Sequence, residues 1–305
     1  MTGEHPGGKT ARYPPRLRVV ARGWLPIMLP VVSRNPPAVE APLAQTLARQ
    51  RRRNPALRVH PGAPQEIGGA SMAAIVAGDP PLLDAHLAAM AAHYETEDRE
   101  VVARFFLSGV TWHLARAAVG ACAREQRVPL LPPPALGVAC NAAGFPLALS
   151  LASEGFACLP QDPAAQHPAA VVVADEAALM ACLRTELVSA VQPLIFALRQ
   201  RARLGERALW IAAAEACAAA LVEGLPPGTP SAVAQARVDA LLGDPASPLR
   251  AHPELVETTG QFGLLGHDCC AMYRLPGQPY CATCPHRPRA DRLAALQAWL
   301  AATAG

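Results

Sequence analysis

The chain has 305 residues, of which 51% are hydrophobic and 5% aromatic, and its formal net charge is +3. Basic residues are concentrated near the start: residues 1–60 hold 11 Lys and Arg against 2 Asp and Glu, which leaves 16 against 22 for the remainder. A basic run can contact nucleic acid or anionic lipid, but the prolines and glycines scattered around this one favour a solvated tail, so no nucleic-acid partner is assigned. No run approaches the roughly 20 apolar residues that span a bilayer, and the first residues lack the order of a secretory signal. We therefore expect a soluble, cytoplasmic protein without a transmembrane segment.

The distribution of proline and arginine divides the chain into three parts. Residues 1–74 form a basic, Pro- and Arg-rich extension that we expect to be largely disordered, including the run Arg51-Arg52-Arg53. Residues 75–250 hold most of the helical periodicity and form the predicted body. Residues 251–305 form a C-terminal segment with clustered cysteines and a terminal helix.

Helical periodicity and end signals predict a mainly helical body. In chain order the predicted helices are one of about four turns from Asp79, then 96–126, one from Asp175 that is interrupted at Pro193, 206–221, 230–243 and 291–302. Two short strands, 136–140 and 146–151, flank a turn, and Val171 to Val173 supply a third. The predicted fold class is α+β, with a small antiparallel sheet and a short Cys-rich C-terminal segment.

The cysteines carry the strongest chemical signal. There are nine, an odd number without a secretory signal, which favours reduced thiols over a disulfide framework. Cys269-Cys270 is followed by ten residues and then by Cys281-Ala282-Thr283-Cys284, so four thiols lie within 16 positions. The other five are isolated, and we expect them to act as small hydrophobic residues: Cys122, Cys140, Cys158, Cys182 and Cys217.

Four clustered thiols indicate a metal centre, because thiolate-only ligand sets select zinc or iron-sulfur clusters. Structural zinc sites generally use two spaced pairs of ligands, whereas the adjacent side chains of Cys269 and Cys270 diverge. A two-iron cluster with four thiolate ligands accepts a wider spread of sulfur positions. The spacing therefore favours a 2Fe-2S cluster. The alternative is a structural zinc on the same four cysteines in a non-enzymatic protein that binds a ligand or partner.

The pattern Cys-Cys-x10-Cys-x2-Cys near the C-terminus, with Tyr-Arg-Leu-Pro-Gly in the gap and Pro285 after the last thiol, resembles the FhuF family of siderophore-iron reductases. Weaker agreement extends over residues 75–290, so the body is the FhuF-like candidate for siderophore binding. The resemblance implies that Cys269, Cys270, Cys281 and Cys284 are the ligands of a 2Fe-2S cluster. It also implies one-electron reduction of a ferric siderophore, often of the hydroxamate type, in the cytoplasm.

The remaining partner is an electron donor. The sequence has no Gly-rich dinucleotide fingerprint after a strand, so an external one-electron donor, a ferredoxin or a flavoprotein, is implied. His267 and His286 flank the thiols, and Tyr273 and Arg274 lie in the loop between them. These four side chains have two possible roles. They tune the cluster or contact the chelate, or they are ordinary surface residues, solvated or ion-paired.

Overall fold

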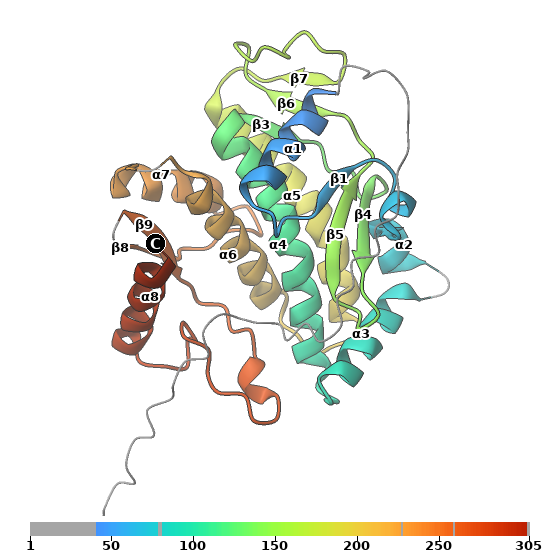
Figure 1. Cartoon of the computed structure of the whole chain (residues 1–305), viewed down its shortest axis with the longest axis vertical. Helices are drawn as coiled ribbons and strands as arrows, with labels where there is room; N and C mark the ends of the chain where they lie inside the picture. The colour runs from blue at the N-terminus through green and yellow to red at the C-terminus, as the bar shows by residue number, and fades with distance from the viewer. Residues whose placement is uncertain (1–40, 79–80, 227, 259, 304–305) are drawn as a thin grey trace, which may run out of the picture. The chain divides into compact units, whose positions relative to one another are not determined.

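The computed structural model describes residues 41–78, 81–226, 228–258 and 260–303 (Figure 1). These described residues belong to one compact unit. Its helices are α1 (Pro42–Arg53), α2 (Met72–Ala77), α3 (Leu82–His93), α4 (Arg99–Glu125), α5 (Glu176–Arg199), α6 (Glu206–Gly224), α7 (Ser231–Leu242) and α8 (Arg289–Thr303), with 3-10 turns η1 (Pro64–Ile67) and η2 (Met272–Arg274). Its strands are β1 (Val59–Pro61), β2 (Ala70–Ser71), β3 (Arg127–Pro129), β4 (Leu136–Cys140), β5 (Pro146–Leu151), β6 (Phe156–Cys158), β7 (Ala170–Val172), β8 (Glu254–Thr258) and β9 (Gln261–Leu265).

Helix α4 forms the centre of the core, against which α5 and α6 pack. Its start is fixed by Asp98, whose carboxylate accepts hydrogen bonds from the N–H groups of Glu100 and Val101, as an N-cap residue does. Its buried face includes Phe106, which is fully buried. Burial of such side chains is the main stabilising term of the body. The mainly helical α+β class predicted from the sequence is confirmed.

Two small sheets lie against this helical core. The order in the first is β1-β5-β4-β2, and the predicted hairpin is its antiparallel β4-β5 pair. The order in the second is β3-β6-β7. Both sheets also contain a parallel pair, β1 with β5 and β6 with β7, so both are mixed, and the predicted antiparallel hairpin belongs to the first of them.

The C-terminal part contains a third pairing, the antiparallel hairpin of β8 and β9, on which α8 packs. Buried side chains of both elements meet there, including Leu265 from β9 and Leu296 and Leu300 from α8. The contact is close at Gly263, where an added Cβ would lie 2.9 Å from Leu296 Cδ1. The packed hairpin and α8 therefore fix both ends of the stretch of chain that carries the clustered cysteines.

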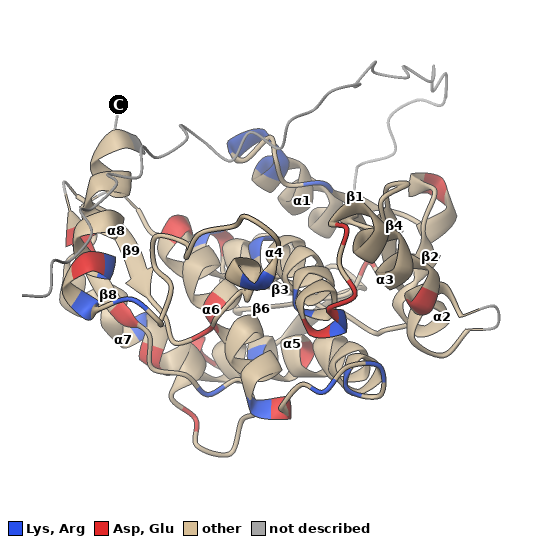
Figure 2. Cartoon of the chain, turned by 90° about the horizontal axis from the view of Figure 1, so that it is seen from below, with Lys and Arg blue, Asp and Glu red and all other residues tan. Residues whose placement is uncertain are grey.

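One sequence prediction is wrong for the part of the extension that the structure describes. Residues 41–74 are ordered, and Leu43 and Leu47 of α1 are buried to 2% and 1% exposure in the main core. The arginine run is not a free tail, because it forms the last turn of α1, where positive charge suits the helix dipole (Figure 2). Prolines suggested disorder here, but Pro42 occupies the first turn of a helix, where proline is tolerated. The predicted disorder of residues 1–40 lies outside the described residues.

Two smaller predictions are also corrected. Helix α5 continues through Pro193 without interruption, because the tertiary packing of its buried side chains outweighs the hydrogen bond that proline cannot donate. The strand expected at Val171 to Val173 forms as β7, but it pairs with β6 in the second sheet and does not extend the β4-β5 hairpin. Pairing partners of this kind depend on tertiary contacts that a local pattern does not contain.

Among the described helices, α5 alone is long and apolar enough to cross a membrane by length and composition. In this structure it packs against α2, α4, α6 and α7, and Leu183, Leu187 and Leu194 are buried. Such packing is typical of the core helix of a globular protein.

Candidate functional site

The four clustered cysteines lie in a segment, here called the cysteine segment (266–288), that connects β9 to α8. The first arm, 266–270, leaves β9 and carries Cys269 and Cys270. The second arm, 281–284, carries Cys281 and Cys284 and precedes α8. Between the arms the chain forms η2 and a turn in which Gly277 has φ 71°, a conformation that favours glycine. The chain reverses direction at this turn, which brings the two arms together.

The thiols are arranged in two cross pairs. Cys270 Sγ lies 3.9 Å from Cys281 Sγ, and the Cys269 thiol contacts that of Cys284. Each member of the adjacent pair therefore meets a different member of the Cys-x-x-Cys turn. This arrangement agrees with the divergence of adjacent side chains, because each of the two adjacent thiols meets a different thiol of the second arm.

Backbone N–H groups and burial set the electrostatics of these sulfurs. The hydrogen bond with Cys281 lowers the pKa of Cys270, and the N–H of Met272 acts in the same direction. The same contact, together with burial, raises the pKa of Cys281 above its ordinary value. For Cys269, burial raises the pKa, and the N–H of Ala271 opposes that effect. Cys284 is 1% exposed, whereas the other three thiols are half-buried.

This donor set fits a 2Fe-2S cluster. In such a cluster each iron takes two thiolates, and N–H groups directed at the sulfurs stabilise the added negative charge. Among the described residues, no group of three or more His, Cys, Asp or Glu side chains is placed to hold a metal ion, so the fit rests on the chemistry of the four thiols.

The first arm is fixed to the helical body by Glu215 of α6. Its carboxylate accepts hydrogen bonds from the N–H groups of His267 and Asp268, the second at 3.1 Å. Burial raises the pKa of Glu215, whereas these two hydrogen bonds lower it. Gly266 leaves the space that the carboxylate needs, because an added Cβ there would lie 1.9 Å from Glu215 Oε2.

Helix α4 supplies two further contacts. Arg104 donates to Asp268 Oδ1 at 3.0 Å and to the carbonyl of Cys269 at 3.1 Å, and both side chains are largely buried. Arg274 forms ion pairs with Asp98 at 2.7 Å and with Glu100 at 2.5 Å. These ion pairs attach the middle of the cysteine segment to the first turn of α4. Arg274 is therefore ion-paired and not directed at a sulfur.

The other loop residues noted in the sequence form an aromatic group beside the second arm. The ring centroids of Tyr273 and Tyr280 are 4.9 Å apart, and those of Tyr273 and His286 are 5.1 Å apart. Tyr280 and His286 are exposed, as is His267 on the first arm. The residues that sequence reasoning missed are Glu215, Arg104 and Arg292. Glu215 and Arg104 lie on helices far from the cysteines in sequence, Arg292 lies on α8 eight positions after Cys284, and no local motif marks any of the three.

The five isolated cysteines lie elsewhere. Cys122, Cys158 and Cys217 are buried, and burial raises the pKa of Cys217 to about 12. Cys140 and Cys182 are partly buried, on β4 and α5. A thiol that stays protonated in an apolar environment is inert. Their predicted role as small hydrophobic residues agrees with this placement.

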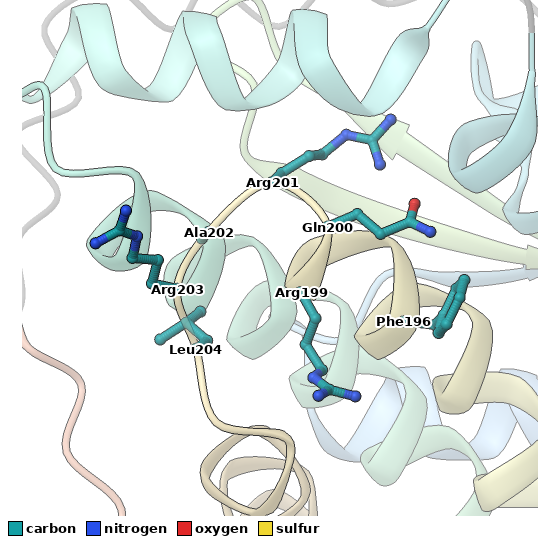
Figure 3. A pocket seen from close by; sticks show the side chains of 7 residues that line it. All are labelled: Phe196, Arg199, Gln200, Arg201, Ala202, Arg203 and Leu204. Carbon is teal, nitrogen blue, oxygen red and sulfur yellow. The ribbon is translucent and has the colours of Figure 1, made fainter.

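A surface depression of about 450 Å³ lies at the end of α5 and the loop that follows it (Figure 3). Three of its seven lining residues are Arg199, Arg201 and Arg203. Arg201 is engaged with Asp84 at 2.7 Å and Arg199 with Glu206 at 2.5 Å. Figure 3 shows the three guanidinium groups pointing in different directions, so they do not converge on a common ligand.

Comparison with known proteins gives one family match and a fold likeness. Residues 269–286 match the FhuF 2Fe-2S C-terminal domain, which confirms the resemblance inferred from the sequence and supports a 2Fe-2S cluster as the cofactor. No curated protein matches this chain.

Two solved structures of aerobactin synthetase IucA from a hypervirulent pathotype of Klebsiella pneumoniae are similar to the chain. One has a TM-score of 0.51 at 14% identity and covers 68% of this chain and 48% of its own. The ATP-bound form has a TM-score of 0.48 at 14% identity and covers 60% of this chain and 41% of its own. This chain thus spans less than half the length of those structures, and the first of them shows a likeness of fold alone.

Proposed function

We propose that this protein is a ferric-siderophore reductase, because residues 269–286 match the FhuF 2Fe-2S C-terminal domain, which links the chain to siderophore-related iron handling. Its ligands to the cluster are Cys269, Cys270, Cys281 and Cys284. The observation that supports this assignment most directly is the arrangement of the four thiols in two cross pairs, with 3.9 Å between Cys270 Sγ and Cys281 Sγ. When bound, the cluster supplies one-electron transfer.

The proposed reaction needs no covalent step in the protein. An external one-electron donor, a ferredoxin or a flavoprotein, loses one electron, and iron(III) in the chelate gains one to become iron(II). Hydroxamate oxygens are hard donors that hold iron(III) tightly, whereas iron(II) is a softer ion that they hold weakly. Reduction therefore releases the metal and leaves the chelator intact. The proposed compartment is the cytoplasm, where thiols remain reduced.

The residues around the thiols provide the surroundings that such a transfer requires. Cys284 is buried and the other three thiols are half-buried, so the site is close to the surface yet partly shielded from water. Glu215 and Arg104 fix the first arm to the helical body, which limits the movement of the ligands between oxidation states. Exposed Tyr280 and His286 border the site at the surface that a chelate or a donor approaches.

The first test is the visible absorption spectrum of anaerobically purified protein, with iron, sulfide and zinc analysis. We expect charge-transfer bands that bleach with dithionite and return when a ferric hydroxamate siderophore is added. Cys281→Ser should abolish both the bands and the reduction. Cys182→Ser, a cysteine of α5 outside the cysteine segment, is the matched control and should preserve both.

Two results would contradict the proposal. A Cys281→Ser protein that reduces the ferric chelate at the full rate would show that the four thiols are not the electron path. A colourless protein that contains zinc, and that iron and sulfide do not reconstitute, would favour a structural zinc site in a binding protein.

A further inference from the structure

The two arms of the ligand set differ in how they are attached to the rest of the protein. The first arm is held by two elements of the helical body, α6 through Glu215 and α4 through Arg104. Hydrogen bonds within the second arm are local: the Cys284 N–H donates to the Cys281 carbonyl at 3.1 Å, and Arg287 donates to the carbonyl of Ala282 at 3.4 Å. Local bonds shape the turn but do not place it against the first arm.

Arg292 of α8 connects the two arms directly. Its Nε donates to the carbonyl of Thr283, in the middle of the second arm, at 3.0 Å. Its Nη2 donates to the carbonyl of Gly266, at the start of the first arm. A guanidinium is rigid and planar, so two of its N–H groups at fixed separation set the distance between the two carbonyls.

The part of α8 that carries Arg292 is fixed by packing. Arg292 lies one residue before Leu293 and four before Leu296, and these side chains pack on the β8-β9 hairpin. The helix approaches β9 at Gly263, where even a Cβ would lie 2.9 Å from Leu296 Cδ1. The side chain of Arg292 is half-buried, so water competes weakly for its hydrogen bonds.

We propose that Arg292 is a positioning residue that holds the Cys281–Cys284 arm against the Cys269-Cys270 arm and so controls how firmly the metal cluster is retained. The inference rests on the proposed assignment of the four ligands. It gives α8 a role in the metal site, although the helix contributes no ligand. It also predicts that the second arm loosens first when the cluster is lost, because Glu215 and Arg104 still hold the first.

The test measures cluster retention and not turnover. Reconstituted Arg292→Met, Arg292→Lys and wild-type proteins are challenged with an iron chelator, and the decay of the visible bands is followed anaerobically. We expect about tenfold faster loss in Arg292→Met, because two charge-assisted hydrogen bonds are removed. Arg292→Lys should lie between the two, since one ammonium nitrogen cannot reproduce the fork.

The matched control is Arg289→Met, three residues earlier on the same helix. Arg289 pairs with Glu254 of β8 at the surface, with 61% of its side chain exposed, and has no hydrogen bond to either arm in the described structure. Its rate of cluster loss should equal that of wild type. Thermal unfolding of each apoprotein separates a loosened site from a misfolded chain.

Three outcomes decide the question. Equal rates for Arg292→Met and wild type would overturn the inference even if the reductase activity is real. Equal acceleration by Arg289→Met would also overturn it, because the effect would then belong to the charge or packing of α8. A wild-type protein that keeps its cluster but reduces no ferric chelate would contradict the proposed function and leave the role of Arg292 standing.

Discussion

The helical body and the cysteine segment are held together by different forces. The body is built around α4, α5 and α6, whose facing side chains are almost wholly apolar and buried. In the cysteine segment, all of which the structure describes, only Ala271, Leu275 and Cys284 are buried. Charged side chains of α4, α6 and α8 hold this segment in place. The body thus gains its stability mainly from the exclusion of water, whereas the segment combines directed polar contacts with one small apolar contact, in which Ala271 and Leu275 pack against Val101 of α4.

The largest expected effect is on the free energy of unfolding, and a core substitution in each region shows how the two regions differ. Phe106 is fully buried in α4, and Phe106→Ala should lower the free energy of unfolding by about 3–5 kcal/mol, since it leaves a cavity. Leu275→Ala, the matched substitution in the cysteine segment, should lower global stability much less and accelerate cluster loss. Denaturant unfolding and visible absorbance measure the two effects. Equal loss of global stability in both variants would show that the segment belongs to the cooperative core.

An intermediate effect uses pH to probe the body alone. Burial, and then the charges of Arg116 and Arg58, lower the pKa of His113 to about 4, from an ordinary value of 6.5. The unfolded chain therefore binds a proton first as the pH falls, and stability is lost between pH 6.5 and 4. The loss reaches about 3 kcal/mol at the acid end. In His113→Gln, this loss of stability between pH 6.5 and 4 should be absent. The carboxylates titrate in both proteins, so their effects cancel when the two pH profiles of stability are subtracted. A His113→Gln protein whose stability has the same pH profile as wild type would contradict the lowered pKa of His113.

The smallest expected effect lies at the junction of the two regions. Gly266→Ala places a Cβ 1.9 Å from Glu215 Oε2, so the carboxylate must move and its hydrogen bonds to the first arm weaken. We expect a cost of about 1–3 kcal/mol, as for other overpacked sites, and a faster loss of the cluster. Gly205→Ala is the control, because no atom lies within 4 Å of its added Cβ. Equal cluster retention in the two variants would show that Glu215 does not position the first arm.

The sequence by itself determined the features that depend on local spacing. It located the four clustered thiols, the FhuF resemblance, the long helix α4 and the β4-β5 hairpin, because ligand spacing, helical period and turn residues are properties of short stretches of chain. The same local reasoning failed for residues 41–74, where prolines suggested disorder and burial of Leu43 and Leu47 decided otherwise.

Only the tertiary structure decided how the thiols pair and what holds them. Arg104 and Asp268 are 164 positions apart, Glu215 and Asp268 are 53 apart, and Arg292 and Gly266 are 26 apart. Nothing in the local sequence of these residues distinguishes them from other helix-surface charges. They gain their roles because apolar packing brings α4, α6 and α8 to the cysteine segment, where a partly buried charge is stabilised by the backbone groups it contacts.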